Sequence, residues 1–464
     1  MKLEWRGIVP VHLFAAAALV TGGFFSTVAA QSPGAPSDFE QDLLRLQQQI
    51  DELKMASPVA QVGACLPADP AVACCAPAPE KPKFPTARLT GFFQADAVWF
   101  SQDATNIAAV GDVQDGADFR RARLAATGQA WDNVSYMLEM DFAFPGRPSF
   151  MDVWMEIDDV VGNNKLRIGQ FRQPFGMEGL TSVKDLPFLE RGLPFAFLPF
   201  RQIGAMLHGN QKDELATWSF AGFRFPTDVY GGNVGDNGGY GMATRLTALL
   251  LSGGQGSPLL HAGFGYSYID PANDQFQYRN QPEVFVGETG GGVPAGVPGS
   301  VPPFVDTGIL TAANANLLSA ELASAVGSFY AQSEFIFANV DQIGGPSVTL
   351  PGASILAGYF LTGESRPYNG KNGVFGGVKP HCNVGKQGGI GAWEIVGRWS
   401  YLDLNDQNVQ GGRLNDITAG LNWYLNPHTK FQFNYIYAML DKPTAPGAGS
   451  SEAGIFAMRA QVDF

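Results

Sequence analysis

The sequence carries little charge and has no long apolar segment beyond its N-terminus. Charged residues make up 16% of the 464 residues, and the mean hydropathy is close to zero. No apolar run of roughly 18 residues, the minimum for a transmembrane helix, occurs after the N-terminal region. A bundle of membrane helices is therefore excluded. A membrane β-barrel is not excluded. Its apolar lipid-facing residues alternate with polar lumen-facing residues, so its mean hydropathy is also moderate.

Basic residues and catalytic motifs are also scarce. The 30 Lys and Arg are outnumbered by 43 Asp and Glu, which gives a net charge of −13 and argues against nucleic-acid binding. The 5 His are scattered, and the common hydrolase, zinc-protease and nucleotide-binding motifs are missing. We therefore expect no enzyme, no catalytic residue, no cofactor and no metal site.

Only 4 cysteines are present. Cys65, Cys74 and Cys75 share one Pro/Ala-rich stretch, and Cys382 lies far away. In an exported protein Cys65 could form a local disulfide with Cys74 or Cys75. A metal site is the weaker interpretation, since no histidine lies nearby.

The N-terminal residues 1–30 are typical of a secretory signal peptide. Lys2 and Arg6 precede a short apolar segment from Leu13 to Val20, and the small residues Ala29 and Ala30 suit a cleavage site. A membrane anchor is the alternative, but the apolar segment is short and is followed by glycines.

Residues 31–57 contain a predicted helix. Its apolar residues alternate spacings of four and three, which is a heptad seam. Because two to three heptads are marginal alone, we expect a periplasmic coiled coil that forms once barrels associate. An amphipathic helix lying against another surface is the alternative. Residues 58–87 are rich in Pro and Ala and indicate an extended linker. The seam consists of Phe39, Leu43, Leu46, Ile50 and Leu53.

From Arg88 to the C-terminus the pattern has a period of two, which predicts β-strands with one apolar face. A soluble β-sandwich also alternates, but it seldom places so many aromatic residues on one face over so long a domain. We therefore predict a transmembrane β-barrel over 88–464. Clear examples of the alternation are NVSYMLEMDF (133–142), GAWEIVGRWSY (391–401), KFQFNYIYAML (430–440) and the last nine residues (456–464).

Glycine- and proline-rich stretches interrupt this alternation. Residues 225–240 and 287–304 predict long extracellular loops, whereas the short turn from Leu425 to Thr429 suits the periplasmic side. The chain ends on Phe464, and a terminal aromatic residue closing a last strand is typical of bacterial outer-membrane barrels.

Several stretches resemble the phosphate-selective porin family, the porins O and P. The resemblance covers 88–464 in the family's order, and only 31–87 lies outside it. It is carried by FRRARL (119–124), IGQFRQPFGMEGLTSVKDLPFLERGLP (168–194), GESRPYNGKNGVFGGVKPH (363–381), GAWEIVGRWSYLDLND (391–406), GLNWYLNP (420–427) and MRAQVDF (458–464).

The resemblance implies an all-β fold: a 16-stranded antiparallel transmembrane barrel, here preceded by the short coiled-coil helix. It also implies a homotrimer in the bacterial outer membrane and a lumen narrowed by the third loop. The expected function is a passive channel for small anions such as phosphate, because cationic side chains in a narrow pore attract anions.

By position, the resemblance makes Arg120, Arg121 and Lys184 the first candidates for the anion path. Strand parity places Arg121 and Arg123 on one face, so Arg120 needs a bulge or a rim position. Lys371 and Lys379 are further candidates from the late loop, and Asp152 is a modulating acid near the constriction.

Two other functions stay open at this stage. A general, weakly selective diffusion porin is favoured by the acidic net charge and by the lack of a dense series of arginines. A structural role, in which the N-terminal helix ties the barrel to the cell wall, could coexist with a channel.

Overall fold

The computed structural model describes residues 83–143, 148–235, 237–252, 258–287, 298–385, 388–443 and 449–464. The expected signal peptide, coiled-coil helix, most of the linker and the disulfide candidates Cys65, Cys74 and Cys75 lie outside these residues. Within them, Cys382 is an exposed free thiol, and no helix is long and apolar enough to cross a membrane.

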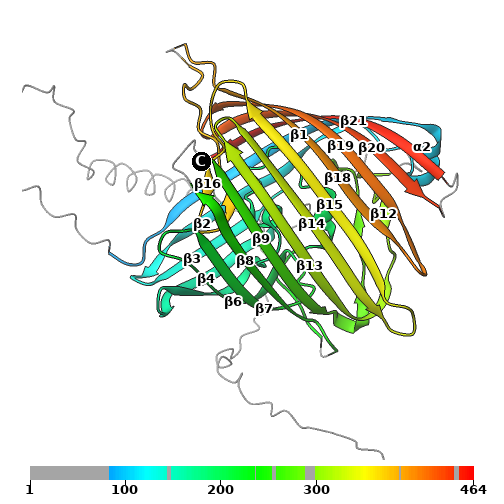
Figure 1. Ribbon diagram of the computed structural model, residues 1–464, viewed down its shortest axis with the longest axis horizontal. Helices are drawn as coiled ribbons and strands as arrows, with labels where there is room; N and C mark the ends of the chain where they lie inside the picture. Colours follow the sequence, from blue (N-terminus) through cyan, green and yellow to red (C-terminus); the bar gives the residue numbers. More distant parts are fainter. Residues whose placement is uncertain are drawn as a thin grey trace, which may run out of the picture. The chain divides into compact units, whose positions relative to one another are not determined.

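A closed antiparallel barrel of sixteen long strands dominates the described structure (Figure 1). Each strand pairs with its neighbours along the chain, and β1 pairs with β21 to close the sheet. This confirms the predicted 16-stranded fold. The barrel strands are β1 (Arg88–Gln102), β2 (Gly116–Trp131), β3 (Val134–Asp141), β4 (Ser149–Val161), β5 (Asn164–Arg172), β6 (Arg201–Asn210), β7 (Ala216–Arg224), β8 (Tyr240–Ser252), β9 (Leu259–Asp270), β13 (Leu310–Val326), β14 (Phe329–Gln342), β15 (Val348–Phe360), β18 (Ala392–Asp406), β19 (Val409–Asn426), β20 (Thr429–Lys442) and β21 (Gly449–Asp463).

The other elements are short and belong to the connections between barrel strands. They are α2 (Ala104–Val110), α3 (Met177–Leu180), the 3-10 helices η1 (Leu193–Phe197) and η2 (Ala272–Asp274), and the two-residue strands β10 (Gln275–Phe276), β11 (Arg279–Asn280), β12 (Val305–Asp306), β16 (Tyr368–Asn369) and β17 (Val374–Phe375).

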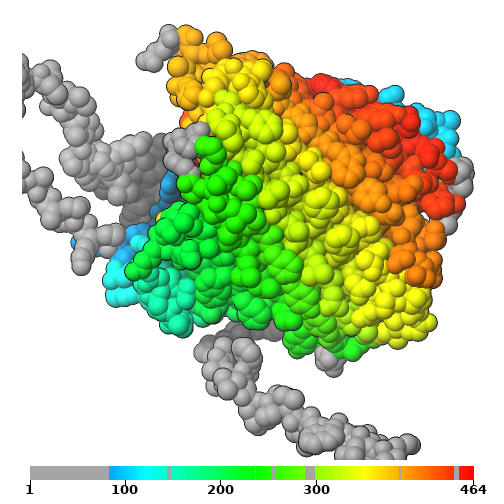
Figure 2. Space-filling model, viewed as in Figure 1, coloured from blue at the N-terminus to red at the C-terminus, as the bar shows by residue number. Residues whose placement is uncertain are grey.

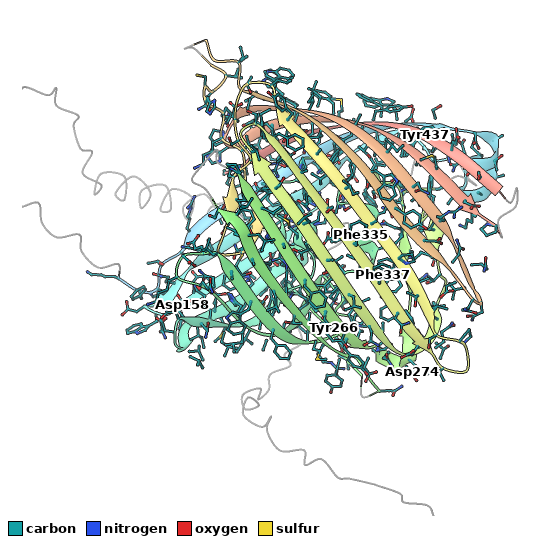
Figure 3. All side chains as sticks on the ribbon, in the orientation of Figure 1. Asp158, Tyr266, Asp274, Phe335, Phe337 and Tyr437 are labelled. Carbon is teal, nitrogen blue, oxygen red and sulfur yellow. The ribbon has the colours of Figure 1, made fainter. Side chains whose placement is uncertain are left out.

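Side chains alternate between the outer wall and the lumen, as the sequence predicts. On β14 the outward Phe335 and Phe337 are 41% and 49% exposed, whereas the inward Glu334 and Ile336 are buried. Figure 3 shows Phe335 and Phe337 on the outer wall, and the strands form a continuous surface in Figure 2. The apolar exterior and the closed hydrogen-bond ladder are what a membrane-spanning barrel requires, because lipid offers no partner to a backbone group.

An aromatic row crosses three strands near the barrel end where β21 finishes, which we call the C-terminal end. The Trp393 and Trp423 rings stack at 5.1 Å, and Trp423 stacks on Phe431 at 6.0 Å. Backbone register places these residues opposite one another on β18, β19 and β20. Such rows match the interfacial aromatic girdles of membrane barrels.

The chain terminus seals the seam between the first and last strands. Phe464 and Gly91 exchange two backbone hydrogen bonds of 3.0 Å each. A Cβ on Gly91 would lie 2.5 Å from the Arg123 carbonyl oxygen and 2.8 Å from the Phe464 ring, so only glycine fits there.

The connections divide between the two barrel ends. Strand order places the turn after β19 at the C-terminal end and the connection between β7 and β8 at the opposite, distal end. We expect loops at one end of the barrel for residues 225–240 and 287–304, and a turn at the other end for 425–429. The strand order agrees with this placement.

We expect a charge on the outer wall to impair the barrel. Phe335 lies at the middle of β14, and replacing it with Arg should cost on the order of 2–4 kcal/mol if this position lies near the bilayer midplane. Urea titration of refolded barrels in bilayers measures the change in the free energy of unfolding. The control is Phe335→Leu, which keeps the apolar surface. Equal stability of the two variants would contradict an outward orientation of this face.

Candidate functional site

The connection between β5 and β6, residues 173–200, folds back into the barrel; we call it the β5–β6 loop. It starts at the distal end and packs on the inward faces of late strands, where Leu189 and Leu193 are fully buried. The Leu193 N–H donates to Ser400 Oγ at 2.8 Å, and Lys430 Nζ donates to the Leu186 carbonyl at 2.9 Å. The β5–β6 loop is the third connection at the distal end, and it narrows the lumen as the resemblance implies.

Two further connections enter the lumen. The described part of the β9–β13 connection (271–309) enters from the distal end, where Asn280 Nδ2 donates to the Leu193 carbonyl at 2.9 Å. The β15–β18 connection (361–391) enters from the C-terminal end, where Tyr368 Oη lies 2.7 Å from His261 Nδ1. Arg245 also donates to the Gly373 carbonyl at 2.8 Å. The β5–β6 loop packs against the later strands, whereas the β15–β18 connection also contacts β8 and β9.

Among the cavities that the described residues form, two are rich in arginine, and we call them the larger and the smaller cavity. The larger, about 370 Å³, is lined by five arginines and four carboxylates. The smaller, about 180 Å³, is lined by four cations, one carboxylate and His208. The arginines of the larger cavity are Arg120, Arg121, Arg123, Arg191 and Arg201; the cations of the smaller are Arg167, Arg172, Arg245 and Lys371.

A carboxylate shared by three arginines forms the centre of the larger cavity's wall. Glu190, from the β5–β6 loop, lies 2.9 Å from Arg120, 2.7 Å from Arg121 and 2.9 Å from Arg459. Arg459 is fully buried and also pairs with Asp96 at 2.7 Å. Arg120 and Arg121 line the cavity together with Glu190. One negative charge therefore balances only part of the positive charge around it.

A bulge in β2 explains how two consecutive arginines reach the same carboxylate. Gln94 of β1 pairs with Arg121, but the next residue, Ala95, pairs with Phe119, which leaves Arg120 as the extra residue. A regular strand would send Arg120 and Arg121 to opposite faces. Of the two positions that strand parity left for Arg120, a bulge or the rim, the structure has the bulge.

A second group of charges joins the two cavities. Asp152 on β4, which lines the smaller cavity, is 3.0 Å from Arg201 of the larger cavity and 3.7 Å from Arg172. Arg123 pairs with Asp141 at 2.7 Å. Asp152, predicted as a modulating acid, thus lies among arginines at the boundary between the cavities.

The lysine candidates lie apart from Glu190. Lys184 is 3.4 Å from Asp463 and 6.0 Å from the Phe92 ring, near the C-terminal end. Lys371 lines the smaller cavity, where it is largely exposed and 3.7 Å from Glu214. Lys379 is exposed on the β15–β18 connection. The structure therefore brings Arg120 and Arg121 together but not the three lysines.

The electrostatic environment of the β5–β6 loop favours negative charge. Burial raises the pKa of Glu190, but Arg120, Arg121 and Arg459 outweigh it and hold the pKa well below its usual range. Burial and the neighbouring Arg172 and Arg121 lower the pKa of Arg191. Among the described residues, the hydrogen bonds of Arg191 go to the carbonyls of Glu178, Gly179 and Thr181 and to no carboxylate. A mobile anion entering here would stabilise this cation.

Sequence reasoning missed Glu190, Arg191 and Arg201 as site residues. Glu190 and Arg191 stand within the stretch that carries the family resemblance, but nothing in their spacing shows which side chains they meet. Sequence reasoning also missed Arg459. Its inward-facing position in the alternation of the last strand was the signal that could have identified it.

The geometry suits passage of anions better than covalent chemistry. Guanidinium groups present forked donors that can replace water around an oxyanion.

In the described part of the chain, no group of three or more His, Cys, Asp or Glu side chains could hold a metal ion.

Comparisons with known proteins agree with this architecture. The profile of phosphate-selective porin O and P matches residues 88–464. Porin O of Pseudomonas aeruginosa is 26% identical over 401 residues, covering 81% of this chain and 88% of that protein. An uncharacterized protein of Caulobacter vibrioides is 26% identical over 364 residues, covering 75% of this chain and 68% of that protein.

Among solved structures, an anion-selective porin from Comamonas acidovorans superposes with a TM-score of 0.49 at 12% identity, covering 82% of this chain and 99% of that one. The profile match extends over all sixteen barrel strands, from the start of β1 to the last residue. The chain therefore belongs to the phosphate-selective porin O and P family and is a channel-forming protein of the outer membrane.

Proposed function

We propose that the protein is a passive diffusion channel for small anions, phosphate among them. The observation that carries this proposal is the excess of guanidinium groups over carboxylates in the lumen around Glu190 and Asp152. A charge in a narrow lumen is poorly screened. Most of the 43 Asp and Glu residues, which give the chain its net charge of −13, do not line the two cavities. The name of Porin O's family, phosphate-selective porin, supports the same solute class.

We further propose a homotrimer, in which residues 31–57 form a coiled coil and 58–87 a linker. The support is the heptad seam that precedes the barrel. The alternative, a barrel tied to the cell wall through the same helix, predicts retention of the protein on isolated peptidoglycan.

The reversal potential across a planar bilayer under a KCl gradient tests the channel proposal. We expect anion selectivity for the unmodified protein, and a lower anion-to-cation permeability ratio for Lys184→Glu, which reverses a charge near the C-terminal end. Phosphate should also block chloride current less well in this variant. A cation-selective or unselective unmodified pore would leave the general diffusion porin as the function.

Removing the charge of Glu190 should increase anion selectivity. In Glu190→Gln the side-chain amide can still accept hydrogen bonds from the three arginines, but they lose their shared counter-charge. The permeability ratio should rise roughly sevenfold, because one unit charge about 7 Å away in a water-like dielectric changes the energies of the anion and the cation by about 0.6 kcal/mol each, in opposite directions. The control is Asp112→Asn, which removes an exposed acid after α2. An unchanged or lower ratio in Glu190→Gln would show that these arginines do not set selectivity.

Deletion of residues 31–87 should leave conducting barrels that form weaker trimers. The reason is that the seam adds contacts between subunits without entering the barrel. Trimer stability is read from the dissociation temperature in mild detergent, and conductance from bilayer recordings. Complete loss of insertion would contradict an accessory role for this segment.

A further inference from the structure

The larger cavity has an apolar side as well as its arginines. Phe150 of β4, Phe195 and Phe200 of the β5–β6 loop, and Phe285 of the β9–β13 connection all line it, and all four are only half-buried. The interior of a porin is ordinarily polar. Four partly exposed rings at the constriction therefore need a reason beyond packing.

The rings and the guanidinium groups interleave. Arg120 lies over the Phe285 ring at 4.8 Å, and Arg201 lies over the Phe200 ring at 4.8 Å. Arg191 lies 4.9 Å from the Phe195 ring, and 5.1 Å from that of Phe200. Three of the five arginines of this cavity thus have an apolar surface of the cavity directly beside them.

Phe200 takes a backbone conformation that places its ring between two arginines. Its φ is 51°, in the left-handed region that non-glycine residues rarely adopt. Its carbonyl accepts a hydrogen bond of 2.7 Å from the Gln173 N–H, which joins the two ends of the β5–β6 loop. The backbone of the β5–β6 loop therefore fixes the position of the Phe200 ring.

This lining is unfavourable for an inorganic anion and favourable for an organic one. The face of an aromatic ring carries partial negative charge, so it repels a bare oxyanion. A cavity of about 370 Å³ falls within the size range of sites for small organic ligands, which are mostly apolar with a few placed polar groups. A ligand with an apolar group next to its charge would use both kinds of surface.

We propose that this cavity binds organic anions whose charged group adjoins a large apolar one, such as aryl phosphates, more tightly than phosphates with little apolar surface. The charged group pairs with Arg120 and Arg191 at the edge of the Glu190 cluster, and the apolar group contacts the four phenylalanines. The inference rests on the proposed anion channel and names its preferred solute class.

Block of chloride current in planar bilayers by phenyl phosphate and by methyl phosphate tests this inference. The two blockers share one headgroup and differ in apolar surface. For the unmodified protein, phenyl phosphate should block at a concentration lower by about tenfold, the effect of burying roughly half of a phenyl ring.

Replacing a ring by a polar side chain should reduce this ratio. In Phe285→Ser and in Phe150→Ser the ratio should fall severalfold toward one, whereas Phe285→Leu and Phe150→Leu should keep most of it. The two positions lie on different segments, so a folding defect in one variant does not affect the other.

Equal block by the two phosphates in an anion-selective unmodified pore would overturn this inference and leave the channel proposal standing. A phenyl preference that is the same in the serine variants would also overturn it, because the apolar surface would then lie elsewhere. A cation-selective unmodified pore would overturn the channel proposal itself.

Discussion

The ion pairs of Glu190 are the interaction on which the constriction depends. Its carboxylate is shared by Arg120 and Arg121 of β2 and by Arg459 of β21, so the β5–β6 loop is tied to strands on both sides of the barrel seam. A buried carboxylate is costly unless it is paired, and three guanidinium groups offset that cost. The same contacts fix the loop and leave the surrounding lumen positive.

This arrangement reconciles an acidic protein with an anion channel. Net charge acts on solubility and on long-range attraction, but a pore is governed by the charges at its narrowest part. Arginines are numerous in the two cavities, and some of them also donate to backbone carbonyls. Arg191 donates to carbonyls of the β5–β6 loop and, among the described residues, to no carboxylate, whereas Arg172 donates to carbonyls of the same loop and also lies 3.7 Å from Asp152.

The three inward connections leave the two arginine-rich cavities beside the earlier strands. The inward faces of the later strands pack against loop residues such as Leu189, Leu193 and Phe304 and form a core. The inward faces of the earlier strands keep charged side chains that line the cavities. A wide barrel thus holds a narrow path, because the loops occupy space that strands alone would leave to water.

Local periodicity in the sequence predicted the strands, their inward and outward faces and a bulge or rim position for Arg120, because side-chain direction along a strand follows from the period of two. The residues that meet in the lumen were not predictable in this way. Glu190 and Arg459 are 269 positions apart, and only closure of the barrel and inward folding of the β5–β6 loop bring them together. Lys184 shows the reverse: the resemblance placed it in the right loop, but tertiary packing put it beside Asp463 rather than at the Glu190 cluster. The sequence by itself determined a barrel with a polar lumen; the tertiary structure decided which charges share that lumen, because their distances depend on loop packing rather than on spacing along the chain.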